Sequence, residues 1–270
     1  MKGRVLICAG SDSGGGAGIQ ADIKSVTALG GYAMTAITAL TAQNTLGVQG
    51  VLPIEPGFVR AQMRSVLDDL GADAVKTGML FDDKVIAAVS DELSHYSALP
   101  LVVDPVMVAK GGSVLLADSA IGALRALLMP KATLLTPNLP EAEALLGRRI
   151  GDLDAMRSAA EEFRAQGSAA VLMKGGHLEG DVLYDVLATA AGIQVFTSTR
   201  IATRHTHGTG CTLASAIATG LAQGMTLADA VGRACDYVHR AIATAPGFGG
   251  GHGPLNHLPD SHLPDSHLPD

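Results

Sequence analysis

Short apolar runs alternate with amphipathic stretches along most of the chain, a pattern typical of folds built from repeated strand–helix units. The apolar runs predict strands at residues 5–9, 33–41, 74–76, 101–104, 133–136 and 170–174. These runs are continuously apolar, without alternating polar positions, as expected for parallel strands that are buried on both faces. The pattern therefore predicts an α/β fold in which helices cover both faces of a parallel sheet.

Helices are predicted where apolar residues recur every three or four positions. Four such stripes lie within residues 59–70, 121–128, 213–221 and 227–242. Residues 181–203 are rich in Val, Thr and Ile but carry no helical stripe, which predicts one or two strands at an edge of the sheet.

One domain is predicted for residues 1–250, because no change in composition and no long linker divides this part of the chain. After three glycines at 249–251, the sequence His-Leu-Pro-Asp occurs three times within residues 257–270. A proline every five residues excludes helix and sheet there, so residues 251–270 are predicted to be a disordered tail without catalytic role. The alternative for this tail is metal binding through His257, His262 and His267.

Composition narrows the function classes. Of the 270 residues 47% are hydrophobic and 17% are charged, which excludes a wholly disordered chain. The net charge is −7 and aromatic residues make up only 3%, so nucleic acid is not an expected partner. No apolar run suggests a membrane span, and the first residues do not resemble a signal peptide. Three cysteines without metal-ligand spacing fit a reducing compartment, so we expect a cytoplasmic protein.

Candidate chemistry gathers after the predicted strands, because ligands of open α/β sheets bind beyond the carboxyl ends of the strands. Residues 10–18 form a glycine-rich segment after the first strand. A dinucleotide-binding fingerprint would need a third glycine in place of Ile19 and an acidic residue near Gln43, and the chain contains no Walker-type phosphate loop. The segment is therefore either a flexible turn or a backbone that lies close to a small ligand.

Gln43 closes the second predicted strand. Its amide offers one acceptor and two donors, so it can pair bidentately with an aminopyrimidine edge; the alternative is that it only satisfies loop backbone groups. Asp22 lies in the helix that follows the glycine-rich segment, and Met79 lies in another strand-end loop, where by itself it is typical of a core residue.

Four polar side chains follow the central strands. Asp104 is either a loop cap or a ligand of a metal-bound water. Asn138 and Glu141 have the spacing of a helix capping box, with hydrated Mg²⁺ as the functional alternative. Lys174 is suited to a phosphate contact but equally to a solvated strand end. Residues 109–113 resemble a mobile flap.

The strongest candidate is His207-Gly208-Thr209-Gly210-Cys211, which runs into a predicted helix. Glycines before a helix leave N–H groups aimed at one point, where the helix dipole also favours an anion. A cysteine in that first turn is expected to have a lowered pKa. An anion hole beside a proton acceptor suits phosphoryl transfer to an alcohol, whereas the alternative is a structural cysteine, as we expect for Cys8 and Cys235.

Taken together, these segments resemble the hydroxymethylpyrimidine/phosphomethylpyrimidine kinases of thiamine biosynthesis, in the ribokinase-like superfamily. The resemblance runs from about residue 5 to residue 258. It is carried by residues 9–22, 41–45, 47–51, 75–80, 103–110, 134–143, 173–178 and 206–212. Each segment alone is weakly specific, whereas their combination is highly specific.

The resemblance implies a three-layer α/β/α sandwich with a mostly parallel central sheet, commonly dimeric. It implies ATP-dependent phosphorylation of 4-amino-5-hydroxymethyl-2-methylpyrimidine, and then of its monophosphate to the diphosphate. Carried over by motif, it makes Cys211 the base, with Gly208 and Gly210 as anion hole. The pyrimidine would contact Gln43, Asp22, Met79 and Val106; ATP would contact Lys174 and Thr209; Mg²⁺ would be served by Asp104, Asn138 and Glu141.

Three rivals remain at this stage. A pyridoxal-type kinase is the nearest, because relatives in the superfamily use the same Gly-Thr-Gly-Cys site on vitamin B6 alcohols. A nicotinamide oxidoreductase is disfavoured by the missing glycine and acidic residue. A non-catalytic binding module would leave Cys211 beside an anion hole unexplained.

Overall fold

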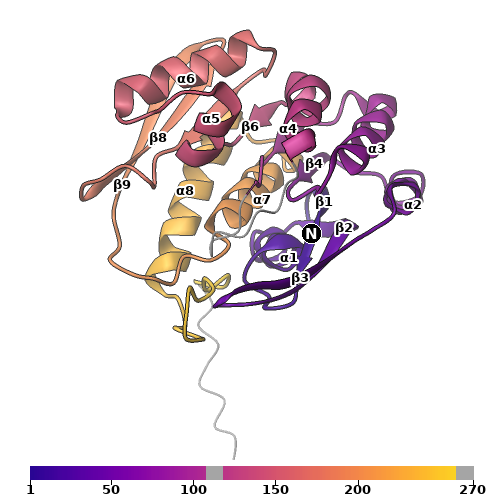
Figure 1. Ribbon diagram of the computed structural model, residues 1–270, viewed down its shortest axis with the longest axis horizontal. Helices are drawn as coiled ribbons and strands as arrows, with labels where there is room; N and C mark the ends of the chain where they lie inside the picture. The colour runs from indigo at the N-terminus through magenta and orange to yellow at the C-terminus, as the bar shows by residue number, and fades with distance from the viewer. Residues whose placement is uncertain (108–117, 260–270) are drawn as a thin grey trace, which may run out of the picture.

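The computed structural model describes residues 1–107 and 118–259 (Figure 1). The predicted flap at residues 109–113 lies outside the described residues, as does most of the repeated segment at the end of the chain.

Nine strands of the described chain form one sheet in the order β3-β2-β1-β4-β5-β6-β7-β8-β9. The pairs from β2 through β7 are parallel, while β3, β8 and β9 pair antiparallel at the two edges. The strands are β1 (Arg4–Asp12), β2 (Tyr32–Asn44), β3 (Gly47–Pro53), β4 (Ala74–Thr77), β5 (Leu101–Val103), β6 (Leu134–Leu135), β7 (Val171–Lys174), β8 (Val182–Thr189) and β9 (Gly192–Thr199). The mostly parallel sheet is confirmed.

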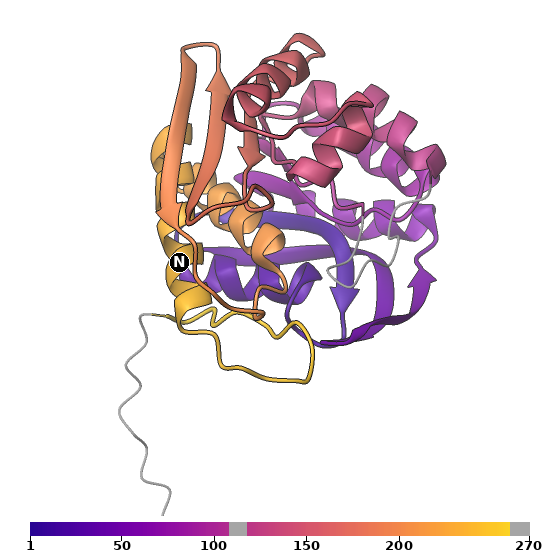
Figure 2. The same cartoon turned by 60° about the vertical axis from the view of Figure 1, so that its left-hand side comes forward.

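Helices cover both faces of this sheet (Figures 1 and 2). One apolar cluster holds the face under α2 (Pro56–Leu67), α3 (Asp83–Leu93), α4 (Asp118–Ala123), α5 (Leu139–Leu146) and α6 (Leu153–Ala165). A second cluster holds the face under α1 (Gly18–Ala28), α7 (Thr209–Ala222) and α8 (Leu227–Ala243). The three-layer α/β/α sandwich is thereby confirmed, with one core on each side of the sheet.

The six predicted strands and the four predicted helical stripes are all present, with bounds that differ by a few residues. The two strands expected within residues 181–203 are β8 and β9, which form an antiparallel hairpin at one edge. The stripe at 121–128 begins as α4 and continues as a π-helical turn, Leu124–Leu128. Pro130, two residues after this turn, cannot donate a backbone hydrogen bond, so a regular α-helix does not continue there.

Residues 251–259 differ from the predicted disordered tail. Leu255 and His257 are buried against the domain. The hydroxyl of Tyr237 donates to the carbonyl of His257 at 2.8 Å, and Nε2 of His257 lies 3.1 Å from Oγ1 of Thr212. Irregular chain can be buried when its backbone groups find partners. Residues past the predicted boundary at residue 250 therefore pack against the domain.

His257 also bears on the alternative of a histidine metal site. Burial lowers the pKa of His257 to about 4, and its ring faces a threonine. His262 and His267 lie outside the described residues. In the part of the chain that the structure describes, no helix is long and apolar enough to cross a membrane.

Candidate active site

The candidate site lies where the direction of the strand connections reverses. The chain passes from β1 to β2 on one side and later returns to β4 on the other side of β1. Ligands of open α/β sheets bind at such a switch point, beyond the carboxyl ends of the strands. Asp12, Asp104 and Lys174 stand at or directly after the ends of β1, β5 and β7, so the sheet brings them to one edge.

The glycine-rich segment after β1 is wound around a carboxylate. Asp12 is only 3% exposed and accepts backbone N–H groups from Gly14, Gly16 and Ala17 at 2.8, 3.1 and 2.8 Å. Burial raises the pKa of Asp12, but hydrogen bonds from His207 and from these N–H groups outweigh it, so the net pKa is lowered. Sequence reasoning assigned no role to Asp12, although an Asp followed by small residues is a signal for such a turn.

A second glycine loop presses on the first. Gly208 precedes α7 with φ of 86°, in the left-handed region, and a Cβ there would lie 1.8 Å from the carbonyl oxygen of Gly16. Only glycine permits this approach. Thr209 turns its hydroxyl back to the carbonyl of Thr206 at 2.8 Å. Within the described residues, no hydrogen bond occupies the N–H groups of Gly210 and Cys211, so the predicted anion hole has free donors.

Cys211 does not have the electrostatics predicted from the sequence. Burial, with smaller contributions from Asp22 and Asp104, raises the pKa of its thiol to about 12. Lys76 and the N–H of Gly18 act in the opposite direction without compensating. The prediction of a lowered pKa is therefore wrong for this structure, because desolvation outweighs the helix N-terminus.

Asp22 is also placed differently from what direct pyrimidine contact requires. Its side chain is fully buried, and both carboxylate oxygens accept from Nζ of Lys76 at 3.0 and 2.9 Å. Ser215 donates to Oδ1 of Asp22 at 2.6 Å. Burial raises the pKa of Asp22 despite Lys76, whereas the pKa of Lys76, which burial lowers, is raised overall by Asp22 and its neighbours. Asp22 thus holds a buried cation beneath Cys211 and offers no exposed surface to a ligand.

Asp104 and Lys174 form an ion pair at the centre of the strand ends. Nζ of Lys174 lies 2.8 Å from Oδ1 of Asp104, which also accepts from Thr136 at 3.1 Å. The other oxygen of Asp104, Oδ2, is buried without a partner in the described structure. Burial lowers the pKa of Lys174, but Asp104 and Glu141 reverse the shift, so the pKa is raised overall and the ammonium stays charged.

Asn138 and Glu141 form the capping box at the start of α5. Asn138 accepts the N–H of Glu141 at 2.9 Å, and Oε2 of Glu141 accepts the N–H of Asn138 at 2.8 Å. Glu141 also lies 3.8 Å from Nζ of Lys174. Burial raises the pKa of Glu141 to about 7, although Lys174 lowers it. The capping geometry does not remove Glu141 from the site, since the same carboxylate approaches Lys174.

The predicted pyrimidine contacts surround the glycine loops. The amide of Gln43 is half-buried, with Nε2 3.2 Å from Nε2 of His207. Met79 is nearly buried, and a Cβ on Gly10 would lie 2.5 Å from its terminal methyl. Val106 is half-buried. Together with residues that include Gly78, it lines a cavity of about 10 Å³, and this cavity is too small for a ligand.

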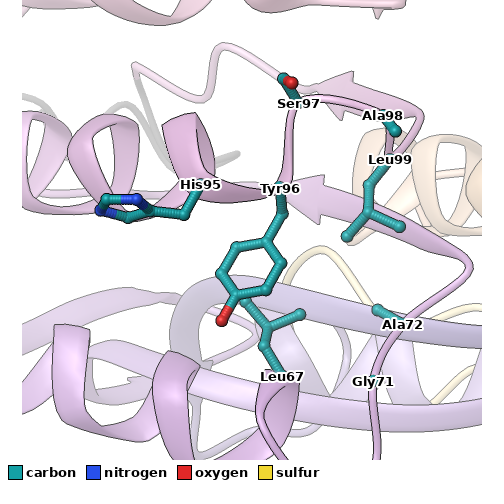
Figure 3. A pocket seen from close by; sticks show the side chains of 8 residues that line it. All are labelled: Leu67, Gly71, Ala72, His95, Tyr96, Ser97, Ala98 and Leu99. Carbon is teal, nitrogen blue, oxygen red and sulfur yellow. The ribbon is translucent and has the colours of Figure 1, made fainter.

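A larger hollow of about 330 Å³ lies at the amino ends of the parallel strands, before the starts of β4 and β5 (Figure 3). It is lined by Leu67, Gly71, Ala72, His95, Tyr96, Ser97, Ala98 and Leu99. None of the predicted site residues lines it, so this hollow is separate from the candidate site.

Known kinase sequences are similar to this chain over most of its length. The sequence model of the phosphomethylpyrimidine kinase family matches residues 12–256. The hydroxymethylpyrimidine/phosphomethylpyrimidine kinase of Streptomyces coelicolor is 51% identical, over 94% of this chain and 93% of its own. That of Bacillus subtilis is 46% identical, over 94% of each chain. The thiamine biosynthesis bifunctional protein ThiED of Geobacter sulfurreducens is 51% identical over 95% of this chain, which spans only 52% of that longer protein.

Solved structures show the same fold. Phosphomethylpyrimidine kinase of Clostridium difficile superposes with a TM-score of 0.80 at 41% identity, over 89% of this chain and all of that one. Pyridoxal kinase of Bacillus subtilis in an ADP complex gives 0.87 at 35% identity, over 95% and 98%. Pyridoxal kinase of Staphylococcus aureus with AMP-PCP and pyridoxal gives 0.89 at 32% identity, over 97% and 96%. Backbone likeness therefore does not distinguish the two kinds of kinase, whereas sequence identity favours the first.

Proposed function

The chain belongs to the phosphomethylpyrimidine kinase family, and from this membership we propose that it phosphorylates 4-amino-5-hydroxymethyl-2-methylpyrimidine with ATP and then converts the monophosphate to the diphosphate. Its ribokinase-like fold is that of ATP-dependent kinases. The roles proposed below for individual residues follow from the contacts described above.

The observation that carries the proposal is the meeting of three groups at the start of α7. A Cβ on Gly210 would lie 3.2 Å from Nζ of Lys174 and 3.6 Å from Oδ2 of Asp104. Free N–H groups, a cation and an unpartnered carboxylate therefore face one space. Phosphoryl transfer needs donors and cations at the oxygens of the moving phosphoryl group. We assign the N–H groups of Gly208, Gly210 and Cys211 to the anion hole, and Lys174 and Thr209 to the phosphates of ATP.

The same residues fit a hydrated Mg²⁺ ion. Oδ2 of Asp104 is buried without a partner, and Glu141 is a second buried carboxylate beside Lys174. Mg²⁺ binds proteins through one or two carboxylates and keeps several waters. Asp104 and Glu141 would hold the ion, with Asn138 positioning Glu141, and the ion would supply charge neutralisation at the phosphates.

Cys211 can accept the proton of the substrate alcohol only as a thiolate. Lys76 is the charged side chain that lowers the pKa of this thiol, and Asp22 holds Lys76 in place. The thiol therefore first loses its own proton to water, and the thiolate then accepts the alcohol proton, which leaves late in a loose transition state. We therefore propose that Cys211 is the base and that Lys76 and Asp22 are positioning residues beneath it.

Gln43 defines the other end of the site, and its replacement tests the function. Losing a buried hydrogen-bond partner costs roughly 1–3 kcal/mol, so Gln43→Leu should weaken binding of the pyrimidine alcohol between about fivefold and a hundredfold. Affinity for AMP-PCP should not change, because Lys174 and α7 bind it. Calorimetric titration of both ligands, with pyridoxal alongside, measures this.

Tighter binding of pyridoxal than of the pyrimidine in the intact protein would instead favour the vitamin B6 alternative. An equal loss of both affinities in Gln43→Leu would indicate unfolding and would count against the assignment of Gln43.

We also propose that the protein is a homodimer and acts in the cytoplasm. Leu40 and Leu52 are opposite one another across β2 and β3, so they share a face, and they are 40% and 61% exposed. An apolar face next to an edge strand is suited to a second copy of the chain. Light scattering should give a dimer mass that Leu52→Asp lowers to that of one chain. The three cysteines are free thiols, as expected in a reducing compartment.

A further inference from the structure

His207 stands between the side chains of Asp12 and Gln43. Its Nε2 lies 2.8 Å from Oδ2 of Asp12 and 3.2 Å from the amide nitrogen of Gln43. Both contacts use the same ring nitrogen. The three side chains come from the end of β1, the end of β2 and the loop before α7, so they join the two glycine loops to the pyrimidine end of the site.

In the hydrogen bond between Asp12 and His207, the carboxylate of Asp12 is the acceptor. It is buried, already accepts three backbone N–H groups, and has a lowered pKa, so it stays an acceptor. At 2.8 Å a carboxylate oxygen and an unprotonated ring nitrogen would oppose their lone pairs. Nε2 of His207 therefore carries the proton and donates it to Asp12, whichever charge the ring has.

This protonation in turn decides the orientation of Gln43. A nitrogen that donates to Asp12 has no lone pair for the amide N–H of Gln43, so the oxygen of the amide is the end that fits beside His207. Thr41 lies 3.3 Å from the other end of the amide and already donates its hydroxyl to the carbonyl of Ser11 at 2.9 Å. Its oxygen can thus accept the amide N–H of Gln43. In this orientation the amide oxygen takes the longer arm of a three-centre hydrogen bond, because Asp12 and Gln43 share the one Nε2–H of His207, and the amide N–H reaches Thr41.

The contacts of His207 and Thr41, here called the lock, hold the amide of Gln43 in one orientation and leave one of its edges free. His207 occupies one lone pair of the amide oxygen and Thr41 one of the two amide hydrogens. A primary amide presents one oxygen lone pair and one N–H side by side on its outer edge, and we assign this pair to the ligand. This acceptor beside a donor matches the 4-amino group and ring nitrogen of an aminopyrimidine. A 4-oxo pyrimidine presents the opposite order, carbonyl oxygen beside ring N–H, and needs the amide turned over.

His207 is itself held rigidly. A Cβ on Gly16 would lie 2.6 Å from Cδ2 of the ring, so the first glycine loop packs flat against it. Its backbone N–H donates to the carbonyl of Gly253 at 3.1 Å, and it forms a bridge with Pro254. The chain end beyond the predicted boundary therefore fixes the backbone of His207 while Asp12 fixes its ring.

We propose that His207 is a positioning residue that locks the amide of Gln43 for aminopyrimidines and against their 4-oxo analogues. The inference rests on the proposed function, since it takes Gln43 as the residue that reads the ring. Removing the lock lets the amide turn freely. The fraction of Gln43 suited to the amino compound then falls by at most about twofold. The fraction suited to the oxo compound rises from its small value to one half, so a three- to tenfold preference from one hydrogen bond gives an affinity gain of about two- to fivefold.

The experiment is calorimetric titration with two probes, 4-amino-5-hydroxymethyl-2-methylpyrimidine and its 4-oxo analogue. The intact protein should prefer the amino compound. In His207→Ala the oxo compound should bind about two- to fivefold more tightly, with at most a twofold loss for the amino compound. His207→Gln retains a donor and should restore the preference. Thr41→Val weakens the same lock without changing His207, so it should shift selectivity in the same direction even if His207→Ala folds poorly.

The matched control is His95→Ala, an exposed histidine beside the hollow at the amino ends of the parallel strands, which should leave both affinities unchanged. Unchanged selectivity in His207→Ala and Thr41→Val, or a parallel loss of both ligands, would overturn the inference while leaving the proposed function intact. If the intact protein binds neither pyrimidine, the proposed function fails and the inference falls with it.

Discussion

At the scale of single residues, the state of Cys211 is the clearest point to measure. Its pKa of about 12 predicts that the thiol is protonated at neutral pH. Alkylation of Cys211 by iodoacetamide, followed by mass spectrometry of its peptide, should accelerate about tenfold per pH unit from pH 7 to 10, without a plateau. A plateau between pH 7 and 9 would show that the thiolate is already stabilised and would contradict the buried-thiol description.

The same residue should be needed for turnover but not for binding. Cys211→Ala should lower turnover by about 10²–10⁴-fold, since the donors of the anion hole are main chain and survive the change. Cys211→Asp should restore part of the activity, because a carboxylate can serve as the base, although its charge also repels the phosphates. Near-normal turnover of the alanine variant would make Cys211 a structural residue.

Single residues also show where sequence reasoning ends. Asp104 and Lys174 could be predicted to meet because parallel strands end at one edge. Lys76 could not, since it lies in an apolar strand and its partner Asp22 is 54 positions away. The raised pKa of Cys211 depends on that same buried surrounding, whereas the sequence shows only the start of a helix.

At the scale of elements, α5 combines a helix cap with a site carboxylate. The pKa of Glu141 rises from 4.5 to about 7 on folding, so the folded state binds the extra proton between these pH values. Stability contributed by the neutral acid is complete below pH 4.5 and is lost as the pH rises through about 7. Glu141→Gln keeps a capping partner and cannot ionise, so it should be more stable at pH 8, on the order of 1–3 kcal/mol, and nearly unchanged at pH 4.5.

Urea unfolding at the two pH values measures this effect, and turnover gives the matching functional reading. If Glu141 holds Mg²⁺, turnover of Glu141→Gln should fall at least tenfold, about 1.4 kcal/mol in the barrier. A variant that is less stable at pH 8, with normal turnover at saturating Mg²⁺, would reduce Glu141 to its capping role.

The elements were predicted best where burial dictates their residues. The six parallel strands are continuous apolar runs because helices cover both faces. β3 was not predicted, since it is an exposed edge strand interrupted by Gly50 and ended by Pro53, and neither burial nor periodicity marks such a strand. The capping box was visible in the sequence, but its approach to Lys174 depends on the neighbouring strand end.

At the scale of the whole molecule, residues 251–259 pack against the domain and contribute a buried leucine to it. Leu255 is 3% exposed, so Leu255→Ala should destabilise the protein by about 2–4 kcal/mol. Leu258→Ala, in the same segment but 54% exposed, should change stability by less than about 0.5 kcal/mol. Equal midpoints of urea unfolding for the two variants would show that residues 251–259 do not belong to the cooperative unit. The sequence could not show this docking, because a Pro- and Gly-rich segment has no periodicity from which burial can be read.

The central claim is that the carboxyl ends of the strands bring together the amide of Gln43, which binds an aminopyrimidine, and the groups that transfer a phosphoryl group to it. Phosphorus NMR of the protein with ATP, Mg²⁺ and 4-amino-5-hydroxymethyl-2-methylpyrimidine tests it most directly. The account predicts successive signals of the monophosphate and the diphosphate, with kcat/KM for the pyrimidine at least about tenfold above that for pyridoxal, or about 1.4 kcal/mol. Absence of ATP-dependent phosphorylation of the pyrimidine, or a preference for pyridoxal, would contradict it.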